Sequence, residues 1–308
     1  MKNLRGSLIL LLAAFFWGTT FVAQTSASEK IGTFTFTVSR CVVGSLFLGI
    51  VILLKDNVLL KKTENAADKR KNSWPWIPGI MCGVVLFFAM NTQQFGIGLY
   101  PEEAAASGRA GFLTATYVVM VAVVVQIKGR KNGDKLDGLV ILSILGTVVG
   151  MYFLCMSKGF SGFYIGDAVE LLCACCFTAH IMVIDNYSDV DSVKLSCMQF
   201  ITSGLLSGIM CIILERPQMA DILSAAGPIL YAGILSSGVA YTCQMIGQKY
   251  AEPAVASIVM SLESVFAVLA GCIILNEIMS KRESLGCILV FASVILAQLP
   301  QFKKTKEP

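Results

Sequence analysis

Two stretches of the sequence, TQQFGIGLYPEEAAAS (residues 92–107) and TCQMIGQKYAEPAVAS (residues 242–257), carry one pattern twice. They lie 150 residues apart, and seven of their sixteen positions are identical. The identities include a Thr, a Gln, a Tyr, a Glu and a Ser, which an apolar composition alone does not produce. A shift of 160 residues gives four further identities, between residues 6–14 and 166–174. The sequence therefore indicates an internal repeat, with one copy in each half of the chain.

The composition indicates a membrane protein. Of the 308 residues 56% are hydrophobic and only 14% are charged, and the mean hydropathy is +0.73. Soluble domains carry about 25% charged residues, and a helix that spans a bilayer needs roughly 20 mostly apolar residues. We place ten such runs, separated by short connectors: Leu8–Thr25, Phe34–Leu54, Ile77–Ile97, Glu103–Ile127, Leu136–Met156, Gly166–Ile184, Val193–Leu214, Pro228–Gln248, Ala254–Leu275 and Leu285–Pro300.

Ten spans shared between two copies give five helices to each copy. Because five is odd, the second copy enters the membrane from the opposite side, which makes an inverted-topology repeat. We predict an all-α polytopic membrane protein of ten transmembrane helices, with residues 1–157 as the first five-helix repeat, 163–301 as the second and 302–308 as a cytoplasmic tail. Helices 1, 3, 4, 6, 8 and 9 are expected to form a substrate cavity near the midplane, where such repeats meet.

Basic residues predict the orientation, because Lys and Arg in short loops are retained in the cytoplasm. With the N-terminus inside, 17 of the 24 Lys and Arg residues fall in cytoplasmic segments. Both termini are therefore predicted to be cytoplasmic, in the plasma membrane. The net charge of +4 is explained by this topology, so no nucleic-acid partner is expected.

Three segments carry a family resemblance: LLLAAFFWGTTFVAQ (residues 10–24), SSGVAYTCQMIGQKYAEPAVASIVMSLESVFAVLAGCIILNE (236–277) and LGCILVFASVILAQLP (285–300). They resemble the EamA-like branch of the drug/metabolite transporter superfamily, over essentially the whole chain. The resemblance implies a carrier of the bacterial inner membrane, with ten helices, that exports or takes up small organic metabolites, amino acids among them. Many members have proline after the glutamate matched by Glu263 and glycine before the one matched by Glu277, where this chain has Ser264 and Asn276.

Glu263 is the strongest single candidate for function. It is the tenth of 22 residues in its predicted span, where an ionised side chain costs roughly 3 kcal/mol or more. Three interpretations remain open: a carboxylate that binds a proton or the substrate, a neutral or hydrogen-bonded packing residue tied to Ser261, Ser264 or a neighbouring helix, and an ion-pair partner of Arg109 or Arg40.

Other polar and aromatic side chains within the spans are candidates for lining a pathway or for bridging helices. Arg109 and Arg40 could bind a carboxylate or phosphate with two hydrogen bonds, or extend to the outer headgroups. Glu170 also suits the dipole at the start of its helix. Trp17 could form a stacking wall or pack in the core. The remaining candidates are Gln94, Gln244, Asn91, Tyr117, Ser237 and Tyr241.

The only histidine, His180, suggests two further sites. It shares a helical face with Cys173 and Cys176, a spacing that would suit a soft metal ion, and with Asp185 it makes His-x-x-x-x-Asp, the spacing of some membrane acyltransferases. A packing role is the simpler interpretation, because the sequence carries no second ligand cluster and no further catalytic block. We therefore expect no enzyme, metal or cofactor.

The sequence thus predicts a secondary active transporter of a small organic metabolite such as an amino acid, acting as an exporter or exchanger by alternating access. The expected partners are this small-molecule substrate, the lipid bilayer and, as a candidate coupling ion, the proton; the protein is expected to be a monomer or weak dimer. A membrane-embedded enzyme or a non-transporting multi-pass receptor is the alternative. An enzyme would turn over product without a gradient, and a receptor would need a partner surface that these short loops hardly provide.

Overall fold

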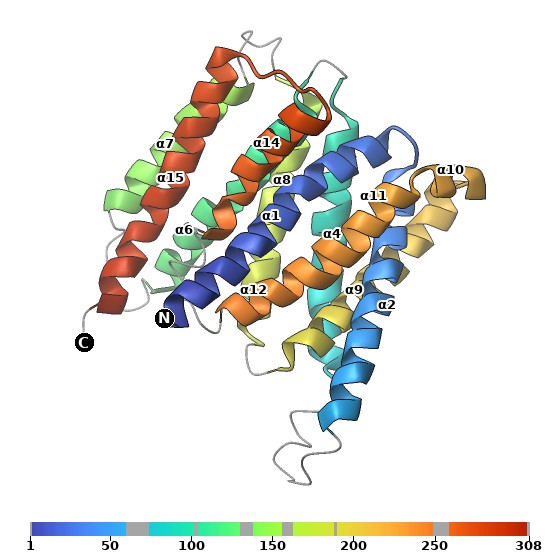
Figure 1. Cartoon of the computed structure of the whole chain (residues 1–308). Helices are drawn as coiled ribbons and strands as arrows, with labels where there is room; N and C mark the ends of the chain where they lie inside the picture. The colour runs from blue at the N-terminus through green and yellow to red at the C-terminus, as the bar shows by residue number, and fades with distance from the viewer. Residues whose placement is uncertain are drawn as a thin grey trace.

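The computed structural model describes residues 2–59, 74–101, 104–129, 138–155, 163–187, 190–248 and 259–306, and within them every regular element is a helix (Figure 1). The helices are α1 (Lys2–Ser28), α2 (Thr33–Leu59), α4 (Trp76–Gly98), α5 (Ala106–Ala115), α6 (Tyr117–Gly129), α7 (Gly138–Cys155), α8 (Ile165–Asp185), α9 (Ser192–Leu214), α10 (Met219–Ser224), α11 (Ala226–Leu230), the π-helix η2 (Tyr231–Ala240), α12 (Tyr241–Gln248), α14 (Glu263–Ile274) and α15 (Lys281–Lys306). Each of the ten predicted apolar runs overlaps one of these helices or a consecutive set of them.

The outer surface of the bundle is rich in large apolar side chains, and charged side chains are buried inside it among the apolar core, which is unusual for a soluble protein. Ile212 and Ile273 are 81% and 77% exposed, whereas Arg109 and Glu170 are 1% and 0% exposed. In the described part of the chain, six helical stretches are long and apolar enough to cross a bilayer: Gly6–Ser28, Thr33–Lys55, Trp76–Gly98, Ala106–Val124, Ile165–Ile184 and Ser192–Leu214. Shorter apolar helices cover Ile141–Leu154 and Val259–Ile274. The chain is therefore an all-helical, multi-pass membrane protein.

Helices from the two halves of the sequence alternate through the bundle. The pairs α7 with α15 and α2 with α9 lie at opposite sides in Figure 1. Between them, α1 packs on α14, η2 and α12, while α4 packs on α8 and α9. The short helix α5 contacts both α14 and α8. This arrangement brings parts of the chain that are distant in sequence to the centre of the bundle.

Glycine pairs at Gly-x-x-x-Gly spacing lie at contacts between helices. The pairs are Gly79 with Gly83 in α4, Gly146 with Gly150 in α7, and Gly204 with Gly208 in α9. A Cβ atom at Gly83 would lie 2.8 Å from the Gln199 carbonyl oxygen of α9, and one at Gly150 would lie 2.8 Å from the Val290 amide nitrogen of α15. Small residues permit this approach, and in lipid such packing holds helices together.

Carboxylates cap helix starts, both within one segment and between segments distant in sequence. Asp191 begins α9, accepts hydrogen bonds from two backbone N–H groups there at 3.0 and 3.2 Å, and pairs with Lys55 of α2 at 2.8 Å. Glu215 accepts from two N–H groups at the start of α2 at 2.9 and 2.8 Å, and Glu277 does the same at the start of α5 at 2.8 and 3.3 Å. These groups would otherwise lack partners at a helix start, so the acidic residues at the ends of the spans have a structural role.

Asn276 explains one departure from the family pattern. Its φ angle is 55°, in the left-handed region that glycine adopts freely and that asparagine tolerates better than other residues. The residue lies just after α14, where the chain turns toward Glu277. Asparagine is therefore an acceptable substitute for the glycine common at this position.

Several expectations fall outside the described residues. They include Glu102, residues 249–258 with most of the second copy of the repeated pattern, and the basic connectors within 60–73 and 130–137.

Candidate functional site

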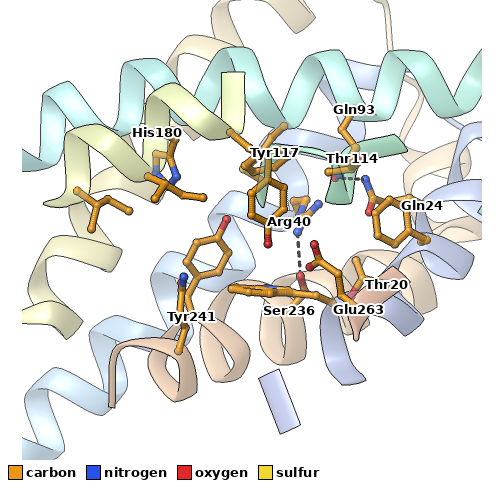
Figure 2. Close-up of a pocket in the computed structure, with 17 residues that line it drawn as sticks. Thr20, Gln24, Arg40, Gln93, Thr114, Tyr117, His180, Ser236, Tyr241 and Glu263 are labelled. Atoms are coloured by element: carbon orange, nitrogen blue, oxygen red, sulfur yellow. Dashed lines mark hydrogen bonds between the residues drawn. The ribbon is translucent and has the colours of Figure 1, made fainter. Parts of the chain in front are cut away.

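A cavity with both polar and apolar walls lies inside the bundle, lined by α1, α2, α4, α5, α6, α8, η2, α12 and α14 (Figure 2). Its empty space, including the part open to solvent, is about 690 Å³. Each of the helices expected to line a cavity contributes side chains, and α2 adds Arg40. The lining residues are Trp17, Thr20, Phe21, Gln24, Arg40, Met90, Gln93, Thr114, Tyr117, Phe177, His180, Ile181, Ile184, Ser236, Tyr241, Gln244 and Glu263.

Two helix interruptions place side chains at the centre of this cavity. The α-helix breaks at Thr116 between α5 and α6, and again at Leu262 directly before α14. The residues that follow the breaks, Tyr117 and Glu263, both line the cavity. The second break forms without proline: the Ser264 hydroxyl instead donates to the Ser261 carbonyl at 2.9 Å, which gives one backbone acceptor a partner. Interrupted helices at such a position provide ligand sites in transporters.

A third irregular segment completes the wall. The ten residues of η2 form a π-helix, a geometry that often marks functional sites. It positions Ser236 in the cavity, where its hydroxyl accepts a hydrogen bond from the Arg40 Nη2 atom at 3.1 Å. Tyr241 follows in α12, and its ring packs edge-on against Trp17 at 5.1 Å and against Phe200 at 5.2 Å between centroids. Trp17 and Tyr241 therefore give the cavity an aromatic wall.

Glu263 is 5% exposed, faces the cavity, and its Oε1 atom has no hydrogen-bond partner. The Tyr117 hydroxyl is its neighbour across the cavity. The Ser264 side chain bonds to the backbone and not to this carboxyl group. Among the described residues, Glu263 makes no ion pair within 4.0 Å with either Arg109 or Arg40. The arrangement leaves a carboxyl group directed into the cavity.

Arg109 lies away from the cavity and is held by other groups. Its Nε and Nη2 atoms donate to the two Asp167 oxygens at 3.1 and 2.6 Å. Its Nη1 atom donates to Glu283 at 2.9 Å and to the Leu154 carbonyl at 3.0 Å, and its guanidinium lies 4.8 Å from the Tyr164 ring centre. Arg109 thereby ties α5 to α7, α8 and α15. The contacts of Arg109 fit a structural role in joining helices, whereas Arg40 lines the cavity and could contact a ligand there.

The other sequence candidates divide between the cavity and the helix interfaces. Trp17, Tyr117, Tyr241, Gln244 and Glu263 line the cavity. Four candidates do not: Asn91 donates to Ser207 at 2.9 Å, Gln94 donates to the Gln24 carbonyl at 3.0 Å, Glu170 accepts from Thr114 at 2.9 Å, and Ser237 is buried near Gly44. The first three form hydrogen bonds between helices, whereas Ser237 packs between η2 and α2 with its hydroxyl group buried and without a hydrogen-bond partner among the described residues.

A chain of polar side chains leads from the cavity to Glu170. Gln24 donates to Gln93 at 3.0 Å, Gln93 donates to Thr114 at 3.4 Å, and Thr114 donates to Glu170. Gln24, Gln93 and Thr114 line the cavity and were not among the sequence candidates. Gln93 neighbours the candidate Gln94, and one residue turns a helix by about 100°. The sequence signal was therefore present, but it did not specify which glutamine faces inward.

His180 also lines the cavity. Its Nε2 atom lies 3.0 Å from the Gln199 Oε1 atom, and both residues are buried. Cys173 donates to the Ala89 carbonyl at 3.5 Å. Within the described ranges, no group of three or more His, Cys, Asp or Glu side chains could hold a metal ion. His180 is thus a polar wall residue of the cavity.

Comparisons with known proteins agree with one another. A model of the EamA-like transporter family matches residues 4–124 and 164–299. A protein of Archaeoglobus fulgidus called an uncharacterized transporter is 28% identical over 300 residues, which cover 97% of this chain and 87% of that protein. A solved crystal structure, whose title gives only "protein", superposes with a TM-score of 0.65 at 19% identity, over 97% of this chain and 100% of the other. This last likeness concerns the fold alone.

Proposed function

Since the chain belongs to the EamA-like transporter family, we propose that it is a secondary active transporter of a small organic metabolite, such as an amino acid or related compound, working by alternating access as an exporter or exchanger. The family and the name of the archaeal relative point to a transporter and not to an enzyme. The observation that carries the proposal is the internal cavity, because both halves of the chain supply its walls and one of its lining carboxyl groups, that of Glu263, has a buried oxygen without a hydrogen-bond partner.

The proposal includes ten transmembrane helices in two inverted repeats, residues 1–157 and 163–301. Two segments, 4–124 and 164–299, match the family model, in agreement with this division. Several helix contacts support it as well, because each has a counterpart when the halves are exchanged. The packing of α4 on α8 and α9 is matched by the packing of η2 on α1 and α2, and the contact of α5 with α8 is matched by that of α14 with α1. Repeats related in this way can rock against each other around a fixed site.

The chain is proposed to lie in the plasma membrane with both termini in the cytoplasm, as a monomer or weak dimer. The excess of Lys and Arg in the inner segments supports this orientation. The proton is the proposed coupling ion, and Glu263 the proposed coupling group, because a carboxyl group at the break of a helix can bind and release a proton as access alternates.

Flux in proteoliposomes tests the function. Wild-type protein would be reconstituted with a pooled panel of amino acids, nucleobases and cationic dyes, and uptake and exchange read by mass spectrometry with and without a pH gradient. We expect at least one compound to move in the wild type, and Glu263→Gln to lose the gradient dependence while exchange persists. The exposed residue Arg216 offers the matched control Arg216→Gln, which should behave as wild type. Absence of substrate-dependent flux across the panel would refute the proposal.

A further inference from the structure

Arg40 is a buried cation that the protein itself leaves incompletely bonded. Its side chain extends from α2 into the cavity and is 5% exposed. Its Nη2 atom donates to the Ser236 hydroxyl at 3.1 Å, and its Nε atom has no acceptor. No carboxylate in the described part of the chain forms an ion pair with it within 4.0 Å. Because a guanidinium has five N–H donors, Arg40 retains capacity for a ligand oxygen.

Arg109 shows what a structural arginine looks like in the same bundle. It is also almost fully buried, but Asp167 binds it at two positions and Glu283 at a third. The protein thus supplies acidic partners where an arginine joins helices. Around Arg40 the described residues supply one serine hydroxyl and the ring of Phe36 at 5.7 Å. Among the described residues, Arg40 therefore lacks the acidic partner that Arg109 has.

Glu263 presents the complementary charge to the same space. Its Oε1 atom is buried and without a partner. Figure 2 shows the Arg40 and Glu263 side chains reaching into the cavity from α2 and α14. The two groups have opposite charge, yet they do not close into an ion pair. A ligand with one anionic and one cationic end would give both groups a partner.

Resting on the proposed function, we propose that Arg40 and Glu263 are the two poles of a subsite for a zwitterion, an amino acid whose carboxylate binds Arg40 and whose ammonium group binds Glu263. Guanidinium binds carboxylate with two parallel hydrogen bonds, which fixes the orientation of the ligand as well as its affinity. Met90, Phe177 and Ile181 line the same cavity, and Trp17 and Tyr241 form its aromatic wall, so the side chain of the ligand is apolar or aromatic.

Binding of matched ligands to the purified wild-type protein tests both poles without a mutation. The twenty amino acids are screened first by calorimetry. Two analogues of the tightest binder are then measured: the acid that lacks the amino group and the amine that lacks the carboxyl group. Because a buried charged group left without its partner carries a large penalty, we expect each analogue to bind at least about tenfold more weakly. If no amino acid binds, or if either analogue binds as tightly as the parent, the proposal is wrong.

Variants assign each pole to its residue. Arg40→Gln should remove the preference for the amino acid over the amine, and Glu263→Gln should remove the preference over the acid. Arg40→Lys keeps the positive charge but loses the two parallel N–H donors of the guanidinium, so part of the preference for the amino acid over the amine should remain. Arg216→Gln is the surface control. If Arg40→Gln does not fold, the Arg40→Lys variant and the comparison of the three matched ligands on the wild-type protein still test the proposal. A preference that survives in the folded glutamine variants would overturn the assignment.

Flux separates this inference from the function on which it rests. Transport of a compound that carries a single charge or none, combined with equal binding of the three matched ligands, would leave the transporter standing and remove the zwitterion subsite. Selective binding of the amino acid without flux in proteoliposomes would support the zwitterion subsite and refute the transport function.

Discussion

Removal of Arg109 should destabilise the protein more than removal of any exposed arginine. The guanidinium is 1% exposed, and the oxygens of Asp167, which is fully buried, lie 2.6 and 3.1 Å from it. Breaking a buried ion pair by removing one partner costs about 3–5 kcal/mol, because the remaining charge is left without compensation. At about 2 °C per kcal/mol for a chain of this size, the melting temperature should fall by roughly 6–10 °C.

Thermal unfolding in one detergent, followed by intrinsic fluorescence, measures this effect. The variants are Arg109→Met, Asp167→Asn and their double combination, with Arg216→Met as the exposed control. We expect the double variant to lose less stability than the sum of the two single losses, because both remove the same interaction. Glu283→Gln should have a smaller effect, since that side chain is 15% exposed.

Two results would refute this reasoning. If the shift for Arg109→Met matches that for Arg216→Met, the tie between α5, α8 and α15 contributes nothing to stability. If Arg109→Met leaves the melting temperature unchanged but abolishes ligand binding, Arg109 is a binding residue and not a tie.

Three further predictions concern packing, backbone and pH. Gly150→Ala should lower the melting temperature by an amount equivalent to about 1–3 kcal/mol, since the new Cβ would meet the backbone of α15. The control Gly49→Ala, with nothing within 4 Å of the new Cβ, should be neutral or stabilising. Equal shifts in the melting temperature of the two variants would contradict the close approach of α7 and α15. At Asn276, where φ is 55°, glycine should preserve stability and valine should lower it by about 1–2 kcal/mol, and thermal unfolding that ranks valine with glycine would exclude the left-handed conformation. The pKa of Asp191 is lowered because hydrogen bonds from the Lys55 ammonium group and from backbone N–H groups outweigh the effect of burial, which acts to raise it. The ionised carboxylate therefore contributes stability above its ordinary pKa of 3.8, and this contribution is lost as the pH falls through the lowered value. Between about pH 6 and pH 3 the melting temperature of Asp191→Asn should thus fall less than that of the wild type, and parallel curves would contradict the shift.

The sequence alone determined the class of the protein. Apolar runs of bilayer length are a one-dimensional property, because each transmembrane helix satisfies its own backbone hydrogen bonds. The repeated stretch at residues 92–107 and 242–257 and the family motifs are also local, so they predicted the family that the comparisons bear out. Glu263 stood out for the same reason, since a carboxylate within an apolar run is visible without any knowledge of its neighbours.

Only the tertiary structure decided which polar residues face the cavity. Arg40 and Arg109 look alike in sequence, each a single cation in an apolar run. The partners that distinguish them come from elsewhere in the chain: the carboxylates of Asp167 and Glu283 for Arg109 and, among the described residues, the hydroxyl of Ser236 for Arg40. Gln93 and Gln94 are adjacent, and the packing of α4 against α1 and α8 turns the first toward the cavity and the second toward an interface. Whether a buried charge joins helices or awaits a ligand depends on groups distant in sequence, because hydrogen bonds and ion pairs form through space and not along the chain.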